Sequence, residues 1–388
     1  MLAVLACTAA PAPASAAVPD GFWGVVPIND LQGPEFVKMG RGGVATLRHL
    51  TLWPLIEPKR DEYNWSGLDY VAANSAENGI EVLPFLYGTP EWARGGCKGL
   101  AEDVCERYPP LKKNAAAAWQ DFLRDFVERY GPQGSFWSNP TDSYDPPYVP
   151  ITQMQIWNEP SSLTYWKPKP KPKQYAKLVR LSSAAINSVD PSVEVVLAGI
   201  FPSPEGGKQF RFTNFLERFY DARGIKKSFD IAAFHPYAAT LGRLRNQIQT
   251  IRRAMREGGV GGKRLWVSEI GWGSDPPQPG RPLIKGVDGQ RSLLEQSFKL
   301  LEARRTGWKI EGVLWYSWRD PGIAYENCPF CSSSGLFKEN GEPKPSWHAF
   351  VQLTGGTETE PEPEPLPEEP APPPPPPPPD CPLPPLPC

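Results

Sequence analysis

Apolar stretches of strand length alternate with helical stretches about eight times between Asp20 and Gly355. In the clearest helical stretch, which we expect Asn114 to cap, apolar residues recur every three or four positions, and the pattern returns near residues 176–186 and 293–301. The face predicted for that first helix holds Trp119, Phe122, Leu123, Phe126, Val127 and Tyr130. The apolar stretches predict strands over residues 22–28, 44–50, 80–86, 149–157, 193–200, 229–234, 264–270 and 312–318.

These strands are apolar along most of their length, which is typical of a parallel sheet covered by helices on both faces. Eight strand and helix units of this kind close into a barrel, so the sequence predicts an α/β protein with a (β/α)8 TIM barrel. The chain of 388 residues does not require a second domain, because a single barrel often exceeds 250 residues.

The composition changes near Gly355. From Thr357 the chain alternates Glu with Thr or Pro and then runs through eight consecutive prolines, Pro372 to Pro379. Such a segment has little apolar surface to bury and favours extended conformations. We therefore expect the barrel to occupy residues 18–355 and a disordered, proline-rich tail to occupy residues 356–388.

The first 17 residues are small and apolar and end in Ala14-Ser15-Ala16-Ala17, which is typical of a secretory signal peptide. No Lys or Arg precedes Lys38, so the usual positive segment is missing. Two alternatives are a disordered start and a lipoprotein signal that ends at Cys7. We expect export, with the mature chain starting near Val18 and located outside the cell or at its surface.

Six cysteines remain after Cys7, an even number that suits an oxidising compartment. We expect one local disulfide between Cys97 and Cys105 and another between Cys328 and Cys331. A zinc site built from these four is the alternative, although their spacing matches no common zinc motif.

The last two cysteines, Cys381 and Cys388, are separated only by Pro and Leu. A polyproline II segment would hold them about 20 Å apart, whereas a disulfide needs Cα atoms within roughly 7 Å. We therefore expect them to be free or to link two chains into a dimer.

The charge is nearly balanced, with 41 Lys and Arg against 43 Asp and Glu, and no basic block could follow a nucleic acid backbone. No transmembrane segment is expected. The chain contains 14 Trp and 13 Tyr, and sugar rings stack on such side chains, although many of these rings serve the core in any fold.

Two strands each deliver a Glu at the carboxyl end: Glu159 follows Ile156-Trp157-Asn158, and Glu269 follows Leu265-Trp266-Val267-Ser268. In a barrel these ends meet at the face where active sites lie. Two facing carboxyl groups can cleave a glycosidic bond, because one stays protonated as an acid while the other attacks or stabilises the sugar cation. A lone Glu at a strand end more often caps a helix or pairs with an Arg.

Seven short motifs, each near a strand end and all in the same order, resemble the retaining (β/α)8 glycoside hydrolases of clan A, most of all families 39 and 5. The resemblance covers residues 21–355. The motifs are Thr46-Leu47-Arg48; Trp53, Ile56-Glu57-Pro58, Tyr63-Asn64-Trp65 and Leu68-Asp69; Val82-Leu83-Pro84 with Tyr87-Gly88-Thr89-Pro90-Glu91-Trp92-Ala93; Trp157-Asn158-Glu159-Pro160; Phe234-His235-Pro236-Tyr237; Ser268-Glu269-Ile270-Gly271; and Leu314-Trp315-Tyr316-Ser317-Trp318.

The resemblance implies that Glu159 is the acid/base and Glu269 the nucleophile. No metal or organic cofactor is expected, because proton transfer and covalent catalysis by carboxylates suffice. The resemblance also implies that Arg48 and Tyr237 hydrogen-bond the nucleophile and that Asn158 binds the sugar 2-hydroxyl. His235 shares an inward face with Tyr237 by the period of two along a strand, so we expect it to contact the sugar or Glu159. Trp318 is expected to lie under the scissile sugar.

Several of these residues have structural alternatives. Arg48 can form an ion pair that serves stability alone, and Tyr237 and His235 can be core residues. Trp92 and Trp272, like Trp53, are candidates both for a sugar platform and for packing. Glu57 is expected to fix its own loop, in which Lys59-Arg60-Asp61-Glu62 stand where the resembled families usually have a Gly.

Three functions fit these observations: a secreted retaining enzyme acting on a β-linked glycan, a carbohydrate-binding barrel without catalysis, and a surface protein whose tail contacts a cell wall or another partner. Glu159, Glu269, Arg48 and Asn158 together favour the enzyme, because a binding protein has no need of all four. A reducing-sugar assay separates the enzyme from the other two. The identity of the sugar, and exo or endo action, depend on loops that the sequence does not place.

Overall fold

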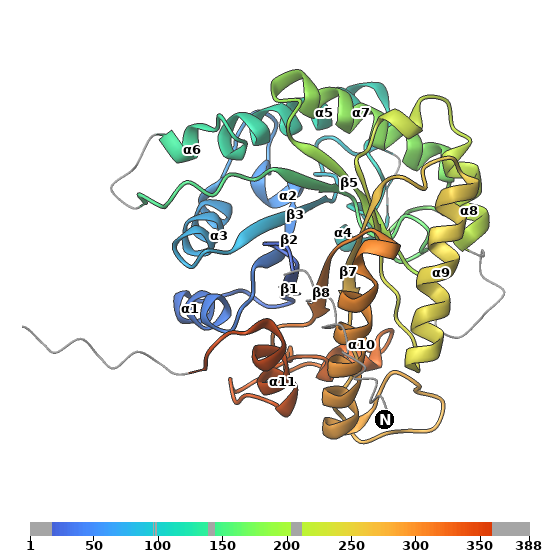
Figure 1. The fold of residues 1–388 in the computed structure, drawn as a ribbon. Coiled ribbons are helices and arrows are strands. Elements are labelled where there is room, and N and C mark those ends of the chain that lie inside the picture. The colour runs from blue at the N-terminus through green and yellow to red at the C-terminus, as the bar shows by residue number, and fades with distance from the viewer. Residues whose placement is uncertain (1–17, 96, 98, 139–143, 203–211, 359–388) are drawn as a thin grey trace, which may run out of the picture.

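The structure is a computed structural model that describes residues 18–95, 97, 99–138, 144–202 and 212–358. Its eight parallel strands pair in sequence order, and the last pairs with the first, so the barrel is closed as predicted. Figure 1 shows the strands at the centre and the helices around them. The strands are β1 (Trp23–Val26), β2 (Thr46–Leu52), β3 (Glu81–Tyr87), β4 (Gln153–Ile156), β5 (Glu194–Ile200), β6 (Ile231–Phe234), β7 (Arg264–Ile270) and β8 (Ile310–Tyr316).

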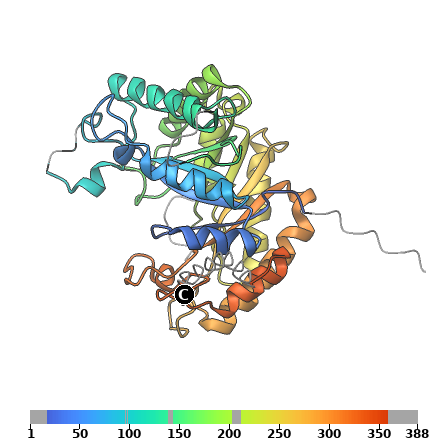
Figure 2. The same cartoon turned by 90° about the vertical axis from the view of Figure 1, so that its left-hand side faces the viewer.

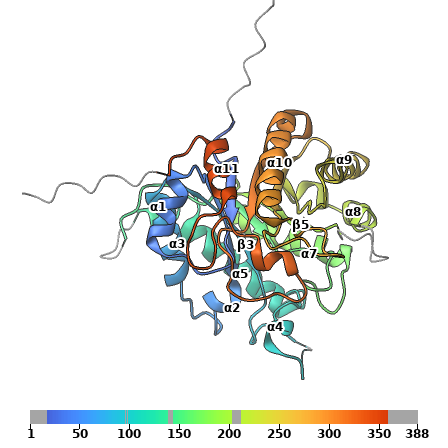
Figure 3. The same ribbon diagram turned by 90° about the horizontal axis from the view of Figure 1, so that it is seen from below.

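The helices cover the outer face of the barrel. Figure 2 shows α1 and α3 side by side on one flank, and Figure 3 shows α8, α9 and α10 on another. The α-helices are α1 (Gly33–Arg41), α2 (Trp53–Ile56), α3 (Ser66–Glu77), α4 (Glu102–Cys105), α5 (Lys113–Tyr130), α6 (Ser135–Ser138), α7 (Pro172–Val189), α8 (Phe212–Tyr220), α9 (Leu241–Glu257), α10 (Gly286–Trp308) and α11 (Pro345–Thr354); the 3-10 helices are η1 (Ile225–Lys227) and η2 (Pro329–Ser333).

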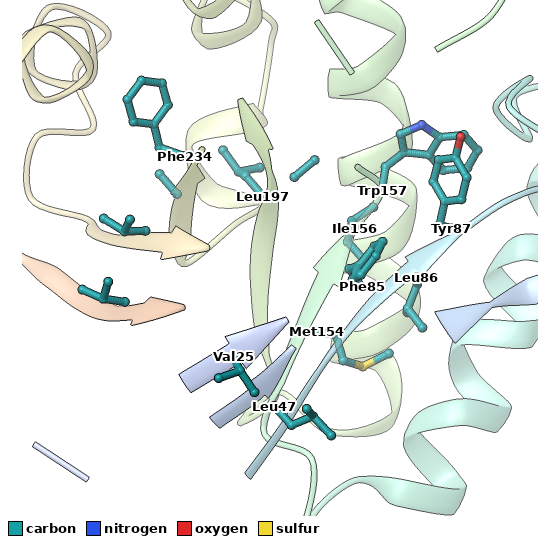
Figure 4. Close-up of a cluster of buried hydrophobic side chains, with 14 of the residues drawn as sticks. Val25, Leu47, Phe85, Leu86, Tyr87, Met154, Ile156, Trp157, Leu197 and Phe234 are labelled. Carbon is teal, nitrogen blue, oxygen red and sulfur yellow. The ribbon is translucent and has the colours of Figure 1, made fainter. Parts of the chain in front are cut away.

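Two apolar layers hold the barrel together. Outward-facing strand residues pack against the helices, as Figure 4 shows for a cluster that includes Val25, Leu47 and Ile156. A smaller cluster fills the barrel interior and contains Val26, Leu83, Val196, Ile231, Ala233, Trp266 and Leu314. Because the lower interior is filled with side chains, any ligand must bind above it, at the carboxyl ends of the strands.

Some predicted boundaries were wrong by a few residues. β1 ends at Val26, before Pro27, which has no N–H to donate to a neighbouring strand. β4 covers only Gln153–Ile156, because Trp157 takes a φ of 73° and leaves the extended conformation. Asn114 lies inside the first turn of α5 rather than capping it, since the extended residue before the helix is Lys112. The predicted apolar face of α5 is buried throughout.

Both predicted local disulfides are present. Cys97 is bonded to Cys105 and Cys328 to Cys331, with Cα atoms 5.7 and 5.4 Å apart. These bonds use all four thiols, so the alternative of a zinc site is wrong.

The predicted signal peptide (residues 1–17) and most of the predicted tail, including Cys381 and Cys388, lie outside the described residues. The described chain continues past Gly355 to Glu358, and the Thr357 N–H donates to the Arg41 carbonyl at 2.8 Å. Among the described helices, none combines the length and apolar character needed to cross a membrane.

Candidate active site

Arg48 organises the polar groups at the top of the barrel interior. It points inward from β2, is fully buried, and lies over the Phe85 ring with its guanidinium carbon 3.9 Å from the ring centre. Its three nitrogens donate to Gln155 Oε1 at 2.6 Å, Glu269 Oε1 at 2.6 Å and Asn158 Oδ1 at 2.8 Å. One rigid cation therefore fixes side chains from β4, from the turn after β4 and from β7.

Glu269 lies near the end of β7 and receives donors on both oxygens. Arg48 bonds Oε1, and the Tyr237 hydroxyl donates to Oε2 at 2.8 Å. Both donors stabilise the ionised form and fix the direction of the carboxylate. These are the two contacts predicted for the nucleophile.

Glu159 faces Glu269 from the turn after β4. His235 Nδ1 lies 2.8 Å from Glu159 Oε1 and 3.5 Å from Glu269 Oε2, so the imidazole is placed between the two carboxyl groups. The predicted contact between His235 and Glu159 is thus confirmed. The position depends on Gly199 of β5, because a Cβ atom there would come within 1.8 Å of His235 Nε2.

The neighbours of the two buried carboxyl groups give them different proton affinities. Desolvation and the negative charge of Glu269 raise the pKa of Glu159 well above its usual range. Desolvation also raises the pKa of Glu269, but Arg48 and Tyr237 act in the opposite direction. The proton shared by the pair therefore resides on Glu159, while Glu269 stays ionised.

Burial, together with the charge of Arg48, lowers the pKa of His235 well below its usual range, so the ring is neutral. A neutral ring with its proton on Nδ1 donates toward Glu159. Nε2, which packs against Gly199, has no hydrogen-bond partner among the described residues.

The turn that carries Asn158 and Glu159 has an unusual backbone. Trp157 and Glu159 have φ angles of 73° and 37°, in the left-handed region that non-glycine residues rarely adopt. The Trp157 indole anchors the turn by donating to the Tyr165 carbonyl at 2.8 Å. Such conformations cost roughly 1–3 kcal/mol each and persist where surrounding contacts determine them, which is common at functional sites.

A cavity of about 710 Å³ opens above these residues. Asn158, Glu159, Tyr237 and Glu269 line it, and Arg48 and His235 lie buried beneath. We call these six residues the polar floor. Asn158 uses its carbonyl oxygen on Arg48, which leaves its amide N–H groups for the cavity. The volume is typical of a site for a small ligand.

The structure does not place Trp318 under this cavity. β8 ends at Tyr316, which occupies the last inward position and lines the cavity. Trp318 lies two residues further, where the chain has turned away. Its indole is 2% exposed, donates to Glu35 Oε1 at 2.9 Å and packs on Phe337.

Trp92 and Trp272 are also absent from the cavity lining. Trp92 donates to the Glu57 carbonyl at 2.9 Å and packs edge-on against Trp53. Trp272 is fully buried and donates to the Ala238 carbonyl at 2.7 Å. For Trp272 the expectation of sugar contact was wrong, because full burial leaves no surface for a sugar. Trp92 is partly exposed outside the cavity lining, and sugar contact by it stays a prediction.

In the loop that departs from the family pattern, one residue takes a conformation typical of glycine. Asp61 takes a φ of 62°, the conformation that a Gly adopts easily. Its N–H donates to Glu57 Oε1 at 2.9 Å, and the Trp53 indole donates to Glu57 Oε2 at 2.6 Å. Glu57 therefore fixes this loop, as predicted.

Three residues of the site were not predicted. Gln155 bonds Arg48, Tyr316 lines the cavity, and Phe330 covers Tyr237 with ring centres 5.0 Å apart. Gln155 could have been found from the sequence, because it is a polar residue at an inward position of an otherwise apolar strand. Tyr316 and Trp318 would lie on the same face of the predicted strand, so the period of two could not show which of them lines the cavity. Phe330 lies in a long loop after β8, for which periodicity offers no signal.

One atom each of Glu159, His235 and Glu269 lies within 4.8 Å of the others, a distance at which a metal ion could bridge them. Both oxygens of Glu269 already accept hydrogen bonds, and Arg48 places a positive charge beside the group. These surroundings suit a pair of carboxyl groups, one ionised and one protonated, better than they suit a bound metal ion.

A buried acid facing an ionised carboxylate, both at the carboxyl ends of barrel strands, is the arrangement of a glycoside hydrolase. The family model for the glycosyl hydrolase catalytic core matches residues 154–350, about half of the chain. The chain belongs to this family. No curated protein matches it in sequence.

Solved structures with the same fold include glycoside hydrolases of families 39 and 5, the families that the motifs indicated. A family 39 glycoside hydrolase from Bacteroides cellulosilyticus WH2 superposes with a TM-score of 0.59 at 18% identity, over 86% of this chain and 63% of that one. A monomeric β-xylosidase from Caulobacter crescentus CB15 gives 0.61 at 18% identity, over 87% and 69%. The GH5_18 protein from Bifidobacterium longum gives 0.62 at 14% identity, over 87% and 79%. The chain thus spans under two thirds of the Bacteroides enzyme.

Proposed function

We propose that this protein is a retaining glycosidase that cleaves a β-glycosidic bond by double displacement, with Glu159 as acid/base and Glu269 as nucleophile. The observation that carries the proposal is the pairing of two facing, buried carboxyl groups whose surroundings keep a proton on one and a charge on the other.

In the first step, Glu269 attacks the anomeric carbon while Glu159 gives its proton to the glycosidic oxygen, so the bond to the leaving group breaks and a glycosyl ester of Glu269 forms. In the second step, Glu159 removes a proton from water, the water oxygen attacks the anomeric carbon, and Glu269 leaves as a carboxylate. The net reaction is hydrolysis with retained configuration.

The short distance between the carboxyl groups supports retention rather than inversion. Retaining enzymes hold their carboxyl groups about 5–5.5 Å apart, whereas inverting enzymes need about 6.5–9.5 Å to admit a water molecule. Glu159, His235 and Glu269 have atoms within 4.8 Å of one another, which fits the shorter spacing.

The other residues of the polar floor have distinct roles in this proposal. Arg48 and Tyr237 hold Glu269 ionised and directed at the anomeric carbon. The Asn158 amide is placed to donate to the sugar 2-hydroxyl. His235 donates to Glu159 and keeps its carboxyl oriented toward the leaving oxygen.

The experiment is an assay with a panel of nitrophenyl β-glycosides, followed by ¹H NMR of the product formed first. The panel includes β-xylosides and β-mannosides, because the names of similar structures include a β-xylosidase and an exo-β-1,4-mannosidase. We expect the β-anomer to appear first and then to mutarotate. Initial formation of the α-anomer would disprove double displacement, and sugar binding without turnover would favour a binding protein.

We also propose that the protein acts outside the cell, on the basis of the apolar start of the chain and the two disulfides, which suit an oxidising compartment. Cell fractionation with N-terminal sequencing of the mature protein tests this. A mature chain that starts near Val18 in the medium or at the cell surface is expected, and an intact Met1 in the cytoplasm would contradict it. We further propose that the tail contacts a cell wall or links two chains into a dimer through its cysteines.

A further inference from the structure

One side of the cavity is lined mainly by apolar side chains. On β2, residues 48, 50 and 52 share the inward face, so Leu50 and Leu52 stand above Arg48 toward the opening. Both leucines line the cavity, and Leu50 remains 41% exposed. Above the cation that fixes the nucleophile, this strand therefore offers no hydrogen-bonding side chain.

The neighbouring strands continue this surface. Val26, Pro27 and Ile28 line the cavity at the end of β1, and Phe85 does so on β3. We call these four residues, with Leu50 and Leu52, the apolar wall. Tyr87, the next inward residue of β3, has the only side-chain polar atom on this part of the described lining, and its hydroxyl lies 3.5 Å from the Tyr165 carbonyl.

The apolar wall lies beside the strand that leads to the acid. β3 pairs with β4 in parallel, with Phe85 opposite Gln155 and Leu86 opposite Ile156. Glu159 follows directly after β4, so the wall adjoins the strand whose end carries the acid that protonates the leaving oxygen.

The next part of the lining has the opposite character. The loops after β3 and β4 contribute Glu106, Arg107, Ser162 and Thr164. These groups, with the Asn158 amide, can hydrogen-bond the hydroxyls of a sugar. These polar groups adjoin the apolar wall. The loops after β7 and β8 complete the lining with residues of both kinds, among them Arg281, Leu283, Glu326 and Phe330.

A sugar ring pressed against the apolar wall would lose water from its hydroxyls without gaining partners, which costs roughly 1–3 kcal/mol for each unpaired group. An alkyl or aromatic group would gain from leaving water at the same place. Because the aglycone is the part of a glycoside that can lack hydroxyls, we infer that the natural substrate is a glycoside with a hydrophobic aglycone, which packs against the apolar wall. This inference rests on the proposed glycosidase activity.

The test measures kcat/KM for methyl, butyl and octyl β-glucosides and β-xylosides, below the concentration at which the octyl compounds form micelles. These alcohols are leaving groups of similar basicity, so chain length changes contact and not chemistry. We expect kcat/KM to rise with each methylene by up to about three- to fourfold until the wall is covered. In Leu50→Ser, the ratio of octyl to methyl kcat/KM should fall by about tenfold.

Leu55→Ser is the matched control, because Leu55 on α2 is 70% exposed and does not line the cavity. It should keep the wild-type ratio. Hydrolysis that is independent of chain length, or an equal loss of the ratio in both variants, would overturn the apolar wall as an aglycone site while leaving the glycosidase proposal intact.

Binding of the same compounds to Glu269→Gln, measured by calorimetry, separates the two proposals further. Affinity that increases with chain length supports the apolar wall even if no tested sugar is hydrolysed, an outcome that would count against the proposed function alone. Affinity that does not change from methyl to octyl would overturn the inference independently of turnover.

Discussion

The polar floor and the walls of the cavity differ in how their side chains are held. In the floor, Arg48 alone makes three hydrogen bonds, and Glu269 accepts one on each oxygen. In the apolar wall, Leu50 is 41% exposed and has no polar partner to fix it. We infer that the polar floor carries out the chemical step and that the residues of the cavity walls determine which substrates bind. Substitutions in the floor should therefore alter the chemical step, and those in the walls should alter substrate preference.

Among substitutions that compare the polar floor with the walls, Glu159→Ala should have the largest effect on activity. Loss of the general acid should lower kcat/KM for alkyl glycosides by about 10²–10⁴-fold, and much less for activated nitrophenyl glycosides, which depart without a proton. The second step then limits kcat for the nitrophenyl compounds, because it lacks Glu159 as its base. Azide should rescue turnover and give a β-azido sugar. If alkyl and nitrophenyl glycosides lose activity equally and azide has no effect, Glu159 is not the acid/base.

The same variant tests the pKa assignment. In the wild type, activity needs Glu159 protonated, and burial beside Glu269 raises its pKa, so activity should be lost on the alkaline side only as the pH rises through this elevated pKa. On the acidic side it should be lost when Glu269 becomes protonated. The alkaline limb should disappear in Glu159→Ala, and an unchanged limb would show that another group causes it.

Gly199→Ala should have the next largest effect. The added methyl would meet His235 Nε2 at 1.8 Å, so the ring must move away from Glu159. We expect loss of about 1–3 kcal/mol in stability and a shifted alkaline limb of the pH profile. The control is Gly67→Ala in α3, where nothing lies within 4 Å of the new Cβ. Wild-type kinetics in Gly199→Ala would show that the position of His235 does not matter for catalysis.

A smaller difference is expected between the two disulfides, because only one of them lies at the cavity. Cys328 and Cys331 line the cavity and flank Phe330, which packs on Tyr237, whereas neither Cys97 nor Cys105 is in the lining. Each bond should contribute at most about 2–3 kcal/mol to stability. We expect replacement of Cys328 and Cys331 by Ser to lower kcat/KM, and replacement of the other pair to lower it less. The reverse order, measured on the folded proteins, would disprove the role of the η2 loop in supporting Tyr237.

Removal of the tail should have the smallest effect. A chain ending at Glu358 keeps the hydrogen bond from Thr357 to Arg41. Because the remaining residues, rich in Pro and Glu, have little apolar surface to bury, activity and thermal midpoint should stay close to those of the full chain. If Cys381 and Cys388 link two chains, non-reducing gels should show dimers of the full protein and none of the shortened one. A large drop in the thermal midpoint would show that the tail packs on the barrel.

The sequence predicted the barrel and the polar floor better than the direction of side chains beyond the strand ends, for a physical reason. Strand residues follow a period of two, so an inward His235 could be placed from its neighbours, whereas Arg48 was predicted from the resemblance to the clan A families. Loop residues follow no period, and the direction of Trp92 or Trp272 depends on tertiary contacts that the sequence does not specify. The prediction that Trp318 lies under the sugar was wrong for a related reason. It assumed that β8 continues to Trp318, whereas the strand ends at Tyr316.

The central claim, that Glu269 is the nucleophile, is tested most directly by trapping the intermediate. An activated 2-deoxy-2-fluoro β-glycoside of the preferred sugar slows the second step, and mass spectrometry of the digested protein then locates the sugar. The account predicts one sugar per chain, esterified to Glu269, and no labelling of Glu269→Gln. A label on another carboxylate, or full turnover by Glu269→Gln, would contradict it.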